Sequence, residues 1–138
     1  MNNRKSIIDT ALELFNELGA GTVTTNHIAD AAGIRPGNLY YHFRNKTEII
    51  STIMEGLFSL WDEVFQLPVN RTPSVKDIER MVADNYALIW KYRFFFREQA
   101  ILLRQDCKLQ KRYQEVRQRG HEGFAALIES FVEAGVML

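Results

Sequence analysis

A short segment of the chain carries side chains suited to binding an anion. Residues 35–46 contain no acidic side chain, and they include these cations and hydrogen-bond donors: Arg35, Asn38, Tyr40, Tyr41, His42, Arg44 and Lys46. An ordinary solvent-facing helix mixes acidic with basic residues. A surface with guanidinium, amide and phenol groups but no acid instead favours a negatively charged partner, such as a row of phosphates.

The apolar and turn residues around this segment predict two short helices joined by a tight turn. Thr24 and Thr25 offer hydroxyl caps for a helix over about 26–32, and Gly33 is able to end that helix in the left-handed conformation. Pro36 suits the first position of a second short helix. Two helices around such a turn form a helix-turn-helix, whose second helix has the width to enter the major groove of DNA.

Helical spacing of apolar residues continues through the rest of the chain, without a strand pattern. Helices are predicted over about 4–18, 26–32, 36–43, 46–65, 75–92, 96–104 and 107–134. Asn45 with Glu48, and Ser74 with Asp77, have the three-residue spacing of a capping box. The predicted fold is all-α. An N-terminal three-helix helix-turn-helix domain over residues 1–48 is joined by a long fourth helix to a helical regulatory domain over residues 49–138.

Composition excludes several classes of protein. Lysine and arginine number 17, and aspartate and glutamate number 17, so the chain lacks the bulk positive charge of a histone-like binder. Cys107 is the single cysteine and cannot form an internal disulfide, which favours a reducing compartment. No apolar run approaches the roughly 20 residues that cross a bilayer. We therefore expect a soluble, cytoplasmic protein with no membrane partner.

A catalytic or metal-binding constellation is not evident. His27, His42, His121 and Cys107 lack the spacing of metal ligands, and the chain has no glycine-rich phosphate loop. We expect no enzyme activity, no metal and no cofactor.

The N-terminal pattern resembles the DNA-binding domain of the TetR family of bacterial transcriptional regulators, over about residues 4–55. The residues that carry the resemblance are Ala11, Leu12, Leu14, Phe15, Gly19, Thr24, Thr25, Ile28, Ala29, Ala32, Gly33, Leu39, Tyr40, His42, Phe43, Lys46 and Glu48. The resemblance implies a DNA-contacting set of Thr25, Asn26, His27, Arg35, Gly37, Asn38, Tyr40, Tyr41, His42 and Lys46.

Within this set the resemblance implies different roles. Arg35 and Asn38 would read base edges, since arginine pairs with guanine and asparagine with adenine. Gly37 would permit close approach of the backbone. Tyr40, His42 and Lys46 would contact phosphates, and Tyr41 a thymine methyl or the backbone. Three alternatives stay open: Tyr40 and Tyr41 as a half-buried core pair, His27 as a plain solvent-facing residue, and Asn26 as a capping residue.

For the regulatory half, the resemblance implies an apolar effector pocket and an effector-driven movement of the fourth helix. The candidate pocket residues are Met54, Phe58, Trp61, Phe65, Tyr86, Trp90 and Phe95. The alternative is that these aromatic residues form ordinary core. We expect Arg93 and Arg97 to lie in solvent or to form an ion pair with Glu98 or Asp106.

The resemblance also implies how such a protein assembles. Family members continue for two further helices that form the dimer interface, so a chain of this length is expected to be shortened or to dimerise through its last helix. The expected function is a ligand-responsive repressor that binds a palindromic double-stranded operator as a homodimer. The alternative is a helical ligand-binding or protein-interaction module whose helix-turn-helix does not bind DNA; the zero net charge favours it.

Overall fold

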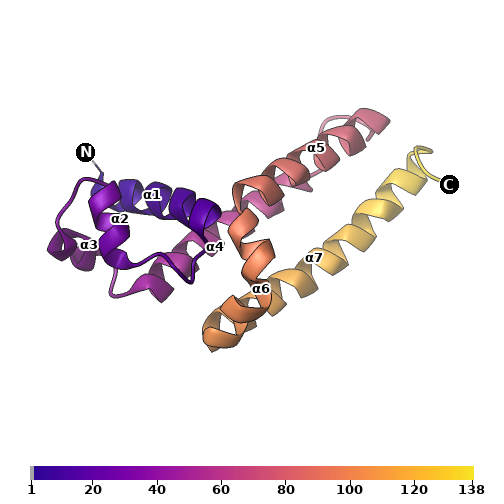
Figure 1. The fold of residues 1–138 in the computed structure, drawn as a ribbon. Coiled ribbons are helices and arrows are strands. Elements are labelled where there is room, and N and C mark those ends of the chain that lie inside the picture. The colour runs from indigo at the N-terminus through magenta and orange to yellow at the C-terminus, as the bar shows by residue number, and fades with distance from the viewer. Residues whose placement is uncertain (1) are drawn as a thin grey trace.

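Figure 1 shows the computed structural model, which describes residues 2–138. Over these residues the secondary structure is seven α-helices without a strand. They are α1 (Asn3–Leu18), α2 (Thr25–Ala31), α3 (Pro36–His42), α4 (Lys46–Val64), α5 (Val75–Lys91), α6 (Arg93–Gln105) and α7 (Cys107–Glu133). The predicted all-α fold is confirmed.

Helices α1, α2 and α3 gather at one end of the molecule, and α5 and α7 extend away from the other (Figure 1). The turn between α2 and α3 has the form that the glycine predicts. Gly33 has a φ of 71°, its N–H donates to Asp30, and the Ile34 N–H donates to the Ala29 carbonyl at 3.0 Å. This pair of bonds is a Schellman motif, which ends a helix and reverses the chain.

The long helix α4 begins with half of the predicted capping box. The Asn45 side chain accepts a hydrogen bond from the Glu48 N–H at 2.9 Å. The Glu48 carboxylate does not return to the backbone of Asn45, because it lies 3.4 Å from Nε of Arg44 in an ion pair. The cap prediction is therefore right for Asn45 and wrong for Glu48.

The junction between α5 and α6 is shorter than the sequence suggests. Helix α6 begins at Arg93, three residues before the predicted start, and Tyr92 alone separates it from α5. Tyr92, Phe94 and Phe95 are all buried, so the predicted basic, aromatic junction packs into the core, and most of it belongs to α6.

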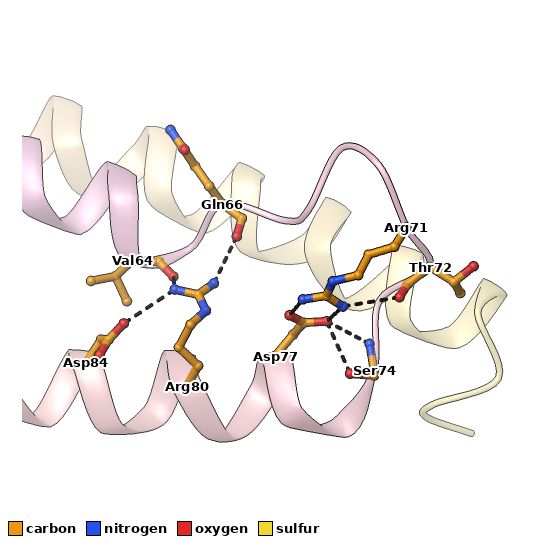
Figure 2. Close-up of polar contacts among 8 residues, drawn as sticks. All are labelled: Val64, Gln66, Arg71, Thr72, Ser74, Asp77, Arg80 and Asp84. Carbon is orange, nitrogen blue, oxygen red and sulfur yellow. Dashed lines mark hydrogen bonds and ion pairs between the residues drawn. The ribbon is translucent and has the colours of Figure 1, made fainter.

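Polar side chains fix the connection between α4 and α5 (Figure 2). Arg80 donates to the Val64 and Gln66 carbonyls at the end of α4, at 3.4 and 3.0 Å. Asp77 accepts both guanidinium nitrogens of Arg71, at 2.6 and 2.9 Å, and the Ser74 N–H at 2.8 Å. The Arg71 guanidinium, followed by the Ser74 N–H, holds the pKa of Asp77 at about 2, below its ordinary value of 3.8.

The apolar core is continuous from the helix-turn-helix into the regulatory half. One cluster of buried residues includes Ile7, Phe15 and Phe43 from the first half and Phe58 and Phe94 from the second. A smaller cluster of Met81, Leu127 and Phe131 lies between the far parts of α5 and α7. The division at residue 48 stays a prediction about domain organisation, since the packing is shared across it. None of the helices in the described part of the chain has the length and apolar character of a membrane span.

Candidate nucleic-acid interface and ligand clefts

The burial pattern of α3 separates its packing residues from its candidate contact residues. Leu39 and Phe43 are buried, whereas Tyr40 is 50% and Tyr41 85% exposed. The alternative of a tyrosine core pair is wrong, because the apolar side chains four residues apart take the inner face. Tyr41 lies edge-on to His42, with ring centroids 5.1 Å apart.

The start of α2 is joined to α3 through two hydroxyl groups. Thr25 Oγ1 and Tyr40 Oη are 2.7 Å apart and hydrogen-bonded. Tyr40 therefore has a fixed direction although half of it is exposed. A side chain held in this way loses less rotamer entropy when it binds a ligand.

His27 has a role that neither sequence interpretation anticipated. Its Nδ1 accepts the Thr24 N–H at 3.3 Å, and its own N–H donates to Thr24 Oγ1 at 3.1 Å. The two residues form a reciprocal capping box, with histidine in the place that glutamate usually takes. Nδ1 must be unprotonated to accept this bond, so Nε2 carries the proton of the neutral ring. The cap of α2 is Thr24, so the interpretation of Asn26 as a capping residue is wrong.

The beginning of α3 is open to a partner. Arg35 precedes the helix with an exposed side chain that makes no capping bond, and Asn38 is half-buried one turn later. A Cβ placed on Gly37 would meet no atom within 4 Å, so packing inside the protein does not require glycine there.

An acidic residue also borders this surface. Asn26, His27, Asp30, Ile34 and Pro36 line a common hollow between α2 and α3. The exposed Asp30 means that the acid-free character of residues 35–46 does not extend over the whole helix-turn-helix.

Lys46 is held by the fold. Its ammonium donates to the Ala20 carbonyl at 2.6 Å and to the Val23 carbonyl at 3.0 Å. The sequence analysis predicts that this ammonium contacts a phosphate. In the structure, two carbonyl oxygens already offset its charge at the start of α4, which leaves one ammonium proton for another acceptor.

Two apolar clefts open along α7, one against the end of α4 and the other against α5. The first, of about 580 Å³, includes Trp61, Phe65 and Phe124 in its lining, with Arg117 and Arg119 from α7. The second, of about 430 Å³, is lined mostly by apolar residues of α5 and α7, among them Phe124, together with Phe65 and the polar Asn85. The rings of Phe65 and Phe124 meet edge-on, with centroids 6.3 Å apart, so they are shared by both clefts.

The seven candidate pocket residues divide into three groups. Trp61, Phe65 and Tyr86 line these clefts. Met54, Phe58 and Phe95 are at most 1% exposed, so they are core residues and not pocket residues. Trp90 is 68% exposed and lies outside both clefts, with the Arg93 guanidinium 4.1 Å from its ring centroid. The spacing of aromatic residues along a helix shows which face they share, but not whether another helix covers that face. It therefore does not distinguish these environments.

A set of polar contacts between α1 and α6 was missed at the sequence level. Glu98 accepts the N–H groups of Ala20 and Gly21, and Arg97 donates to the Asn16 carbonyl. The expected solvent position of Arg97 is confirmed, because its side chain is exposed, and its hydrogen bond goes to a backbone carbonyl. One available signal was Asn16 itself, which stands four residues after Leu12 at a spacing that places both on one helix face.

Metal-ligating side chains do not assemble in the described chain. Residues 2–138 bring no three histidine, cysteine, aspartate or glutamate side chains into a group that would hold an ion.

A family model described as "Bacterial regulatory proteins, tetR family" matches residues 7–53, and one described as "Bacterial transcriptional repressor" matches residues 59–138. A solved structure of a TetR-family transcriptional regulator from Marinobacter aquaeolei superposes with a TM-score of 0.92 and 37% identity, over 98% of this chain and 66% of that one.

Two curated relatives share shorter stretches. The HTH-type transcriptional repressor KstR2 of Rhodococcus jostii is 34% identical over 87 residues, which cover 62% of this chain and 43% of that protein. The class D tetracycline repressor protein of Escherichia coli is 43% identical over 51 residues, or 37% of this chain and 23% of that protein. The matched regions thus span less than half of these curated relatives.

Proposed function

The chain belongs to the TetR family of bacterial transcriptional regulators, and from that premise we propose that it represses transcription by binding an operator with α2 and α3. The observation that carries the proposal is the division of α3 into a buried face, Leu39 and Phe43, and an exposed face with Tyr40 and Tyr41. A helix anchored in this way presents its other side to the major groove without disturbing the core.

We assign the contacts by chemistry. Asn38 and Arg35 read base edges, because amide and guanidinium groups pair with adenine and guanine in the major groove. Tyr40, oriented by Thr25, donates to a phosphate, and the open surface at Gly37 lets the DNA backbone approach. The proton on Nε2 of His27 supplies a further donor at the start of α2.

We propose a homodimer on a palindromic site. One helix-turn-helix makes few phosphate contacts, and two-fold related recognition helices about 34 Å apart reach two half-sites on one side of the duplex. The zero net charge fits this arrangement if attraction to DNA is local to the helix-turn-helix.

We further propose that an apolar effector occupies the clefts along α7. Trp61, Phe65 and Phe124 supply the apolar contacts there. A relative whose name associates it with tetracycline supports regulation by a small molecule. A thermal-shift screen of apolar compounds tests this proposal, since a ligand that binds the folded state raises its melting temperature. Stabilisation by a hit should disappear when Phe124 is replaced by alanine.

The DNA proposal is tested by selecting bound sequences from a random pool of duplexes. We expect enrichment of a palindrome, with an affinity that falls steeply with salt because phosphate contacts release counterions. Asn38→Ala should cost roughly 1–3 kcal/mol on the enriched site and relax the preference at one base pair. Asn70→Ala, in the exposed loop after α4, is the matched control and should bind as the wild type does. Recovery of no enriched sequence would favour the module that does not bind DNA.

A further inference from the structure

The turn between α1 and α2, residues 19–24, is held by charged side chains from two other helices. From α4, the Lys46 ammonium donates to the Ala20 and Val23 carbonyls. From α6, the Glu98 carboxylate accepts the Ala20 N–H at Oε2, 2.9 Å away, and the Gly21 N–H at Oε1, 3.3 Å away. The peptide groups of this turn are thus bound on both their acceptor and donor sides.

A second set of bonds joins the end of α1 to the start of α6. Asn16 is 7% exposed, its Nδ2 donates to the Lys91 carbonyl at 2.8 Å, and its Oδ1 accepts the Phe94 N–H at 3.1 Å. The Arg97 guanidinium donates to the carbonyl of the same asparagine. Asn16 therefore satisfies two backbone groups at the α5–α6 junction, one as donor and one as acceptor.

These bonds constrain direction in a way that apolar packing does not. The neighbouring ring contact of Phe15 with Phe94, with centroids 5.3 Å apart, opposes separation of α1 and α6 but tolerates sliding. A carboxylate with one oxygen on each of two successive N–H groups fixes both distance and orientation. A Cβ at Gly19 would lie 3.5 Å from Oε1 of Glu98, so the turn packs directly against the carboxylate.

Helix α6 also contacts the wall of the first cleft. Trp61, which lines that cleft, meets Phe96 of α6 with ring centroids 6.1 Å apart. Phe96 precedes Glu98 by two residues on the same helix. A displacement of Trp61 would therefore act on the helix that holds the turn before α2.

We propose that Glu98 is a positioning residue that sets the orientation of α2 and α3 relative to α6 and α7. Glu98 binds the turn before α2 and not the recognition helix, and it makes the presentation of that helix depend on the position of α6. This inference rests on the proposed function for its consequence in DNA binding, but the orientation itself is measured without DNA.

The test measures the distance between two spin labels by double electron–electron resonance in a Cys107→Ser background. Asp30→Cys on α2 and Gln118→Cys on α7 place the labels on exposed positions. Labelled protein is diluted with excess unlabelled protein, so that only pairs within one chain are observed. We expect one narrow distance distribution for the otherwise wild-type protein.

Substitutions at Glu98 should change that distribution in a graded way. Glu98→Ala removes both acceptors and should shift or broaden it. Glu98→Gln keeps one acceptor oxygen and the side-chain shape, so it should have an intermediate effect even if the alanine variant folds poorly. Glu79→Ala, which removes an exposed carboxylate of α5, is the matched control and should change nothing. If both Glu98 variants are folded by circular dichroism and keep the narrow distribution, the proposal is overturned.

A second readout connects orientation to DNA. On the selected operator, Glu98→Ala should lower affinity by about three- to tenfold, as expected for loss of charge-assisted bonds that preorganise the site. The slope of affinity against salt should stay at its wild-type value, because no phosphate contact is removed. Unchanged affinity, or a changed slope, would contradict the positioning role. If the wild-type protein binds no DNA, the proposed function fails, while the label distances still decide whether Glu98 sets the orientation.

Discussion

Replacing Lys46 with methionine separates a structural role for its ammonium from a phosphate contact. Methionine keeps a long unbranched stem and removes the donor, which leaves the Ala20 and Val23 carbonyls without their partner. Hydrogen bonds to a charged group contribute roughly 1.5–3 kcal/mol, and Lys46 is half-buried. Because water is able to reach part of the site, we expect a loss of about 2 kcal/mol in the free energy of unfolding for the two bonds together.

Urea denaturation followed by circular dichroism measures this loss, with Lys111→Met on the exposed surface of α7 as the control. For a chain of this size a loss of about 2 kcal/mol corresponds to a fall of about 7 °C in the melting temperature. The salt dependence of operator binding supplies the second readout. A lysine that contacts a phosphate contributes about one to the slope of log affinity against log salt. Full stability of Lys46→Met together with a slope reduced by one would refute the structural role.

Three further predictions concern the recognition helix, the α4–α5 connection and the pocket candidates. Gly37→Ala should raise stability by about 0.4–1 kcal/mol, because a Cβ there meets nothing, yet weaken operator binding; equal or tighter binding would remove the close-approach role. Asp77→Asn should lower the melting temperature at neutral pH, since the depressed pKa of Asp77 contributes stability above pH 3.8 that is lost as pH falls toward 2. The difference from wild type should therefore shrink between about pH 4 and pH 2, and a constant difference would point to lost packing. Phe58→Ala should destabilise by about 3–5 kcal/mol as a core residue, whereas Tyr86→Ala should change unfolding by less than about 0.5 kcal/mol and weaken only ligand-induced stabilisation.

Most helix ends follow from local patterns in the chain. Gly33 adopts the expected left-handed conformation, and Asn45 and Asp106 accept the first N–H groups of α4 and α7. These features involve residues within about one helical turn of each other, so spacing along the sequence contains the relevant distances. The predicted start of α6 is three residues late, because the basic and aromatic residues 91–97 indicate a junction by type, whereas the burial that includes Phe94 and Phe95 in the helix is not a local property.

In the candidate site, too, the features that depend on local spacing are predictable and those that depend on packing partners are not. The exposed face of α3 is a matter of helical period, and Leu39 and Phe43 were correctly identified as its anchors. The helical period does not show which aromatic residues line a cleft. Phe58 lies on α4 and Phe65 caps its C-terminus seven residues later, yet the first is core and the second lies at the cleft, since different partners cover them.

The amino-acid order alone determined the family, the helical class and the division of α3 into a buried and an exposed face, because these depend on residue type and near-neighbour spacing. The tertiary structure decided which charged side chains already bind backbone groups of the protein itself. Lys46 reaches carbonyls more than twenty residues earlier in the chain, and Glu98 binds amides 77 and 78 residues away. A long flexible side chain has no local preference for such partners. Its direction is set only when packing brings a complementary backbone group within reach and removes the competing water.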